Sequence, residues 1–268
     1  MNSLRHDEGI YRARGVVGFS SMESLQVFGV RRLGVPAFFA LAALAVGCAP
    51  TETLAPVGES VTFLGQATPA GMSTTDSDVR VALVIEDRFA TLYVCGGPSS
   101  FGEHSRWFTA ELDRDPVRVG EDVSFDGPIV AIAKDGAVAT FDVEDGVVSG
   151  QVIEPSGLAL SLDATELAPA ADVGSRGLDQ PGLYSTVDDG CRTGVIVFEE
   201  DGELAVQGTW CGAHEAASGN IYAQVTPIMP IFAGPSGIRV RVDSTLAEVA
   251  GRELVAMPVS PRDLRTPR

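Results

Sequence analysis

The sequence predicts an all-β protein, an antiparallel meander that forms a small barrel or sandwich, either as one domain or as two β halves. Three observations support this. Apolar and polar residues alternate with a period of two in several segments. The 30 Gly and 16 Pro are spread through the 268 residues. Amphipathic helical runs are nearly absent, so short strands joined by tight turns are expected.

A secretory signal is predicted ahead of the β region. Arg31 and Arg32 precede the apolar or small run 33–46, which ends at Gly47-Cys48. Two cations followed by such a run form a signal peptide, and the run is shorter than the ~20 residues that a membrane span needs. The segment 44–48 resembles the bacterial lipobox, which implies removal of residues 1–47 and lipidation of Cys48 as the new N-terminus.

The residues around this signal complete the expected anchor. Residues 1–21 resemble no structural element, and Met22 would give a signal of normal length, which favours a start there. Residues 48–78 are rich in Thr, Pro, Ser, Gly and Asp and are expected to form a lipid anchor with a flexible tether, although 61–64 could be a short strand. Ala49 follows the cysteine, and this resembles lipoproteins sorted to the outer membrane of two-membraned cells.

The charge of the exported part excludes one class of partner. Residues 1–47 hold five of the 19 basic and three of the 36 acidic residues, which leaves 14 basic and 33 acidic side chains and a net charge of −19. Such a field repels nucleic acid and anionic lipid heads. No nucleic-acid partner is therefore expected, whereas a cationic partner, divalent ions or simple solubility remain compatible with the charge.

The first β half is expected over residues 79–165. Residues 79–85 alternate, turn near 86–88 and return as 89–95, and 105–112 is a third strand. Residues 137–143 and 147–153 form a hairpin around Asp145-Gly146, a dipeptide typical of two-residue turns. A last strand follows at 158–163.

The second half is expected over residues 183–260, after a linker at 166–182 that is rich in Ala, Pro and Gly and breaks the alternation. Its clearest feature is the hairpin of 195–200 and 203–210 around Asp201-Gly202. Further strands are expected at 221–225, 238–242 and 254–259. Ser244 is a plausible N-cap for a helical piece over 244–250, and 261–268 is a tail.

Two similarities of sequence accompany this pattern. The segments 93–96 and 209–212 each end a hairpin with Cys-Gly, and each is followed by a His beside a Glu, which hints at a duplication. The stretch from Val81 through Tyr93-Val94-Cys95 to Trp107-Phe108, with the later Gly182-Leu183-Tyr184, resembles a family of uncharacterised secreted β domains of GC-rich bacteria. The resemblance spans about residues 79–225. It implies a β domain, and it gives no expectation of a particular activity.

Three cysteines besides Cys48 lie in the exported part, where disulfides persist. A two-residue turn at 201–202 sets a register in which Cys191 and Cys211 fall one residue out of line. A bulge near Gly194 or Gly208 would absorb the difference. We therefore predict a Cys191–Cys211 disulfide.

In that pairing Cys95 is a free thiol, buried at the end of its strand. The rival is a bridge from Cys95 to Cys211 or Cys191 across the two halves.

Few residues suggest chemistry. His214-Glu215 begins like the metalloprotease motif HExxH, but the second His is absent. His104 and His214, each beside a glutamate, would suit zinc only if their loops meet. Cys95 could act as a nucleophile with His104 as its base, although a buried, inert thiol is the commoner outcome. No Gly-x-Ser-x-Gly elbow follows the signal, so we predict no catalytic residue, metal or cofactor.

The expected function is that of a membrane-anchored envelope lipoprotein, attached through Cys48 and acting as a non-enzymatic binding or structural β module. One alternative is an envelope hydrolase or metal-dependent enzyme that uses His104 and His214. Another is an inhibitor or immunity-type protein, suggested only by size and acidity. Ligand, oligomeric state and substrate leave no mark in the sequence.

Overall fold

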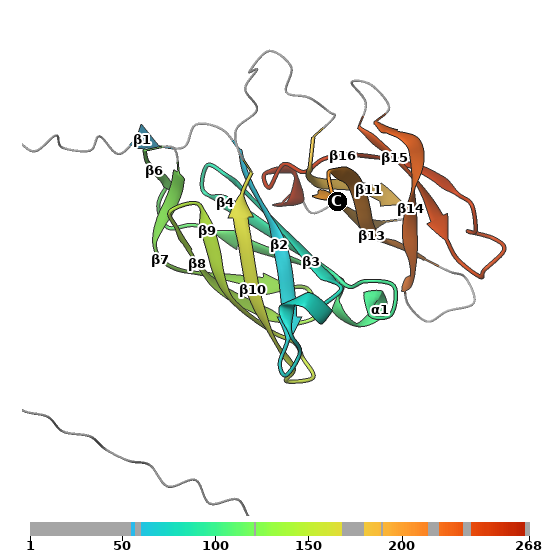
Figure 1. The fold of residues 1–268 in the computed structure, drawn as a ribbon, viewed down its shortest axis with the longest axis horizontal. Coiled ribbons are helices and arrows are strands. Elements are labelled where there is room, and N and C mark those ends of the chain that lie inside the picture. Colours follow the sequence, from blue (N-terminus) through green and yellow to red (C-terminus); the bar gives the residue numbers. More distant parts are fainter. Residues whose placement is uncertain are drawn as a thin grey trace, which may run out of the picture. The chain divides into compact units, whose positions relative to one another are not determined.

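The structure is a computed structural model that describes residues 55–56, 60–120, 122–167, 180–188, 190–213, 220–232 and 237–265. The predicted signal and the anchor at Cys48 lie outside these ranges, as does most of the predicted linker. The described chain is almost entirely antiparallel β-structure arranged as two closed barrels, so the predicted fold class is confirmed (Figure 1). None of the described helices has the length and apolar character needed to cross a bilayer.

The first barrel has eight strands in the order β7-β5-β4-β3-β2-β10-β9-β8 and closes through pairing of β7 with β8. Two short strands, β1 (Ala55–Pro56) and β6 (Val117–Val119), extend the sheet beyond β7. The barrel strands are β2 (Val61–Pro69), β3 (Val79–Glu86), β4 (Phe89–Cys95), β5 (Arg106–Glu111), β7 (Asp122–Ala133), β8 (Val138–Glu144), β9 (Val147–Ile153) and β10 (Ala159–Glu166).

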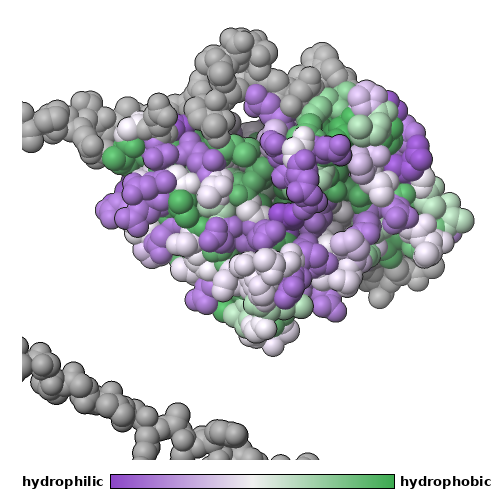
Figure 2. Space-filling view, in the orientation of Figure 1, coloured by the Kyte–Doolittle hydropathy of each residue, from purple (hydrophilic) through white to green (hydrophobic). Residues whose placement is uncertain are grey.

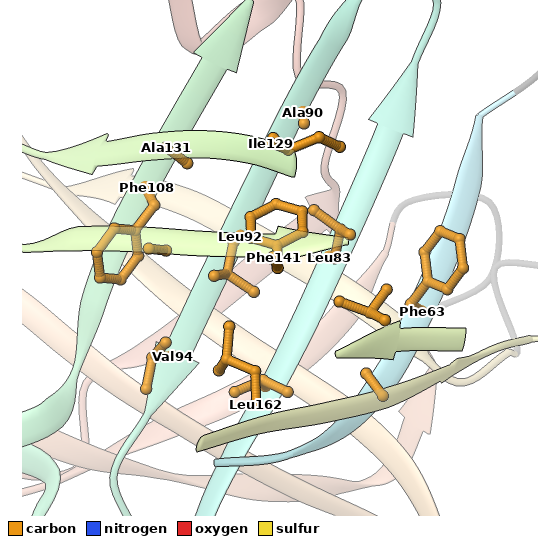
Figure 3. Packing of buried hydrophobic residues seen from close by; sticks show 14 of the residues in the cluster. Phe63, Leu83, Ala90, Leu92, Val94, Phe108, Ile129, Ala131, Phe141 and Leu162 are labelled. Carbon is orange, nitrogen blue, oxygen red and sulfur yellow. The ribbon is translucent and has the colours of Figure 1, made fainter. Parts of the chain in front are cut away.

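The interior of this barrel is filled by its own side chains. All eight strands contribute to one apolar cluster, in which Phe63, Phe108 and Phe141 are fully buried. Figure 3 shows these rings, with Leu83 and Leu92, gathered from different strands into the same interior. Eight strands enclose a space that side chains can just fill, and here aliphatic and aromatic groups occupy it.

The second barrel has six strands in the order β11-β12-β13-β14-β15-β16 and closes through pairing of β11 with β16. The strands are β11 (Gly182–Asp188), β12 (Cys191–Glu200), β13 (Glu203–Ala213), β14 (Asn220–Phe232), β15 (Ile238–Asp243) and β16 (Glu253–Pro258). Its core surrounds the fully buried Trp210, whose Nε1–H donates to Asp188 Oδ2 at 3.0 Å.

The hairpin turns follow the predicted chemistry. Asp145 and Asp201 have φ of 49° and 54°, and the glycines after them have φ of 71° and 79°. Two consecutive positive φ angles are what a twisted two-residue hairpin requires, and Asp-Gly supplies them at low cost. Both predicted hairpins are confirmed, with Glu144 opposite Val147 and Glu200 opposite Glu203.

A third apolar cluster joins the two barrels. The outward faces of β3 and β4, with Ala82, Val84 and Tyr93, pack against Leu183 of β11 and Ile196 of β12. The strands β3 and β4 are therefore buried on both faces. A strand covered on both sides carries an almost continuous apolar run, which residues 81–85 display.

Several boundaries differ from the prediction. The tether was expected to reach residue 78, but Val61–Pro69 is the barrel strand β2, with Val61, Phe63 and Ala67 buried. A short 3₁₀ turn, Thr74–Asp76, follows β2. Alternation of apolar residues in β2 is interrupted by Gly65, where a Cβ would overlap the backbone of β10 at Asp163.

Two further corrections concern the second half of the chain. Residues 244–250 form a turn rather than a helical piece, and Ser244 Oγ accepts only the amide of Leu246, at 3.1 Å. The predicted tail contains a 3₁₀ turn, Asp263–Arg265, whose Leu264 packs against the apolar cluster between the barrels.

Candidate functional site

Within the part of the chain that the structure describes, the predicted pair that comes together is the disulfide. Cys191 and Cys211 are bonded, with Cα atoms 5.4 Å apart, and Cys95 is a free, buried cysteine, so the rival pairing is wrong. The ladder between β12 and β13 keeps the predicted register as far as Gly194 opposite Thr209. Beyond that pair the amide of Cys211 donates to Thr193 Oγ1 at 3.2 Å. The mismatch of one residue is absorbed where the regular ladder ends.

A polar group between the barrels surrounds the free thiol. Ser105 Oγ and Thr209 Oγ1 are 2.7 Å apart, and Cys95 Sγ lies 3.7 Å from the same threonine oxygen. The side-chain amide of Gln207 donates through Nε2 to the backbone carbonyl oxygens of Asp78 and Cys95, at 2.9 and 2.8 Å. These contacts cross from the first barrel to the second and tie β4 to β13.

This environment makes the thiol unreactive. Burial raises the pKa of Cys95, and the hydrogen bonds from Thr209 and its other neighbours only partly oppose the effect. Burial, with the adjacent Cys95, also raises the pKa of Tyr93 well above its usual value. The thiolate is the nucleophilic form, so the raised pKa and the burial of Cys95 both disfavour a nucleophilic role. Close packing adds to this, because a Cβ at Gly194 would overlap the Tyr93 ring, which stacks on Trp107.

His104 lies in a buried charged cluster at one end of the first barrel. It ends the short helix α1 (Phe101–His104), and its Nδ1 is 2.7 Å from Oε1 of Glu154 in the turn between β9 and β10. Both side chains are only 7% exposed. Arg106 Nη1 lies 2.9 Å from the same Glu154 oxygen, and its Nε lies 2.8 Å from Asp135 in the turn between β7 and β8.

Both carboxylates of the cluster are paired with Arg106. Burial acts to raise the pKa of Asp135, but the hydrogen bonds from Arg106 and from the amide of Ala137 outweigh it, and the pKa lies below its usual value. A buried charge is tolerated when it is paired and hydrogen-bonded. The cluster therefore holds α1 and β5 to two turns at the barrel end.

A carboxylate that orients a histidine is also part of hydrolytic triads. Such a triad further needs a nucleophile, and in the described part of the chain no hydroxyl or thiol is hydrogen-bonded to His104. Ser105, its neighbour in sequence, is instead engaged with Thr209 and the amide of Gly96. His214 and Glu215 lie outside the described residues, and no cluster of metal-ligating side chains occurs among those that are described.

Several other carboxylates also have structural partners. Glu200 pairs with Arg80 at 2.7 Å, and Asp188 accepts from Trp210 and from Arg252. Asp78 accepts from the hydroxyls of Ser99 and Ser100, both at 3.0 Å. These groups stabilise turns and strand ends.

The outward side of β7 to β10 was not singled out from the sequence. Cross-strand register places Ile132, Val138, Ile153 and Ala159 in one row, and Val130 lies beside Thr140 in the next. Val130 and Ile132 are more than half exposed. The signal was present in the sequence, because residues 129–133 are apolar throughout rather than alternating.

No known protein family, curated protein or solved structure matches this chain.

Proposed function

We propose that this chain is a lipid-anchored protein of the bacterial envelope that acts through its outer surfaces, as a non-enzymatic binding or structural module. The anchor would be Cys48, with sorting to the outer membrane in a cell that has one. The support for export is the cationic and apolar leader that ends at the lipobox-like segment 44–48. The Cys191–Cys211 disulfide agrees with an oxidising compartment.

One observation carries the non-enzymatic part of the proposal: of the reactive side chains singled out from the sequence, the two that the structure describes are buried and engaged. Cys95 is buried between the barrels, and His104 is paired with Glu154 inside a charged cluster. Both barrel interiors are occupied by apolar side chains. What remains accessible is the outer surface, where hydrophilic areas alternate with smaller hydrophobic ones in Figure 2.

The anchor is tested by Cys48→Ala, with Cys95→Ala as a matched control for loss of a cysteine. Two acyl chains give stable membrane attachment because each buried CH₂ contributes ~0.8 kcal/mol. Cys48→Ala should abolish palmitate labelling and detergent-phase partition, and Cys95→Ala should retain both. Partition of the Cys48→Ala protein into detergent would place the anchor elsewhere.

The alternative, an envelope hydrolase that uses His104, is tested with chromogenic ester, phosphoester and amide substrates. We expect no turnover above that of the heat-unfolded protein. Turnover that disappears in His104→Gln, while the circular dichroism spectrum and the unfolding midpoint stay close to those of the parent, would establish the enzyme and overturn the proposal.

A further inference from the structure

The outward side of β7, β8, β9 and β10, here called the open wall, has an ordered arrangement of side chains. One row is aliphatic and consists of Ile132, Val138, Ile153 and Ala159. The next row along the strands contains Val130, Thr140, Gln151 and Ser161. The third contains Asp142, Ser149 and Asp163. The wall thus runs from aliphatic at one end to acidic farther along.

The aliphatic row is accessible. Ile132 is 57% exposed and Ile153 39%, whereas Val138 and Ala159 of the same row are half-buried, and Val130 in the next row is 53% exposed. The second barrel covers a different part of the first, namely the outward faces of β3, β4 and β5. Contiguous exposed aliphatic groups with a polar border are typical of interaction sites.

The side chains of the wall and its turns are mostly negatively charged. Residues 122–166, which contain β7 to β10 and their turns, hold nine acidic side chains and a single basic one, Lys134. Asp135, Glu154 and Glu166 are paired with Arg106 or Arg118, which come from outside this segment. Among the described residues, Asp142, Glu144 and Asp163 form no ion pair. These exposed carboxylates are available to cations of a partner.

The spacing of the rows determines how far apart the aliphatic and basic side chains of a complementary partner lie. Val138 and Asp142 are four residues apart on one strand, which corresponds to about 13 Å. Asp142 and Asp163 lie on strands separated by β9, so their backbones are about 10 Å apart. A complementary segment carries aliphatic side chains and, about 13 Å away, Lys or Arg.

We propose that the open wall is a docking surface for a basic segment of another protein, one that combines aliphatic side chains with Lys or Arg. This proposal rests on the proposed function as a binding module and specifies its partner. An anionic lipid surface is disfavoured because the wall has the same sign of charge. Symmetric pairing of two open walls would bring like charges together.

The second barrel provides a contrast within the same molecule. Val255 and Met257 on β16 are also exposed, but Val255 lies opposite Arg239 on β15. Glu253 pairs with both Arg239 and Arg241. On this surface the aliphatic groups lie beside arginines, and Glu253 is paired with them, so it is the natural site for control substitutions.

The experiment uses the intact protein purified in nonionic detergent and two synthetic peptides of equal length. One peptide has isoleucines at one end and lysines at the other, and the second has glutamates in place of the lysines. Fluorescence anisotropy should show binding of the lysine peptide that weakens with added salt. Ile132→Thr/Ile153→Thr and Asp142→Asn/Asp163→Asn should each weaken binding about tenfold, a change of about 1.4 kcal/mol. Val255→Thr/Met257→Gln should leave it within about twofold.

Four outcomes would overturn the docking proposal. They are equal affinity for both peptides, no binding of the lysine peptide, wall variants that bind like the control, and self-association that the wall variants abolish, since this last would make a second copy the occupant. All are independent of the labelling and turnover measurements. The docking surface can therefore fail while the anchored, non-enzymatic protein stands, and the reverse.

Discussion

The two barrels differ in how they are stabilised. The first encloses an apolar cluster built from eight strands, with three buried phenylalanines. The second has six strands, a core around the single Trp210, and the Cys191–Cys211 disulfide. A barrel with fewer strands has a narrower interior and buries less apolar area. The smaller barrel combines its core with a covalent link, whereas the larger one relies on packing.

The barrels also differ in where their charges lie. The first buries a charged cluster of His104, Arg106 and Glu154 at one end and leaves carboxylates unpaired on its open wall. The second has exposed arginines that share Glu253. The buried cluster therefore ties elements of the first barrel together, whereas the unpaired carboxylates are the groups on which the proposed docking surface depends.

Truncation of a buried aromatic ring should have the largest effect on stability in either barrel. Trp210→Ala and Phe141→Ala each remove a buried aromatic ring and should each lower the free energy of unfolding by about 4 kcal/mol. Trp210→Ala should cost more, because it also leaves the carboxylate of Asp188 without the indole donor. Urea unfolding followed by circular dichroism measures both. A larger loss for Phe141→Ala would mean that the second barrel depends less on its core than this comparison holds.

Removal of the disulfide should have the next largest effect. Cys191→Ala/Cys211→Ala opens a loop of about 20 residues and should cost about 3 kcal/mol in the chain-entropy model. Hydrogen exchange should rise first in β12 and β13 and later in the first barrel, since the link lies wholly in the second. Exchange that rises equally in both barrels would show that they unfold as one unit despite their separate cores.

Local sequence determined the hairpins, and long-range contacts determined what was missed. Asp-Gly turns and alternation predicted β8 with β9 and β12 with β13, because turn chemistry and period act over a few residues. The register even located the disulfide to within one residue. By contrast, β7 has a register shift between Phe125 and Ile129, and it was missed because Gly127 and Pro128 break the pattern.

The candidate sites were less predictable for the same reason. The sequence pointed to His104, but its partner Glu154 is 50 residues away and is brought close only by barrel closure. The open wall combines residues from four strands, and the apolar run of residues 129–133 indicates only the part that β7 contributes. The burial of Tyr93 and Cys95 depends on the second barrel, and the local signal of that contact is limited to the continuous apolar run of residues 81–85 on the neighbouring strand β3.

Alkaline pH should weaken the junction between the barrels. The pKa of Cys95 is raised in the folded state. The protonated thiol therefore contributes fully to the free energy of unfolding below the ordinary thiol pKa of about 8.5, and this contribution is lost as the pH rises above that value. One such group changes the free energy of unfolding by about 1.4 kcal/mol per pH unit at most. Cys95→Ala should flatten the stability profile between about pH 8.5 and 10. Tyr93→Phe should act only above about pH 10. An unchanged profile in Cys95→Ala would show that the thiol does not couple to folding.

The smallest expected effect compares the two Asp-Gly turns. Gly146→Ala and Gly202→Ala place a Cβ at φ of 71° and 79°, which should cost about 1 kcal/mol each. A Cβ at Gly202 meets open space, whereas one at Gly146 lies 3.1 Å from Asp122 Oδ1. Gly146→Ala should therefore be the more destabilising of the two, although its hairpin lies in the larger barrel. In the Asp122→Ala background the two substitutions should cost the same, because only the backbone term remains. A difference that persists there would assign the excess to the hairpin itself rather than to the contact with Asp122.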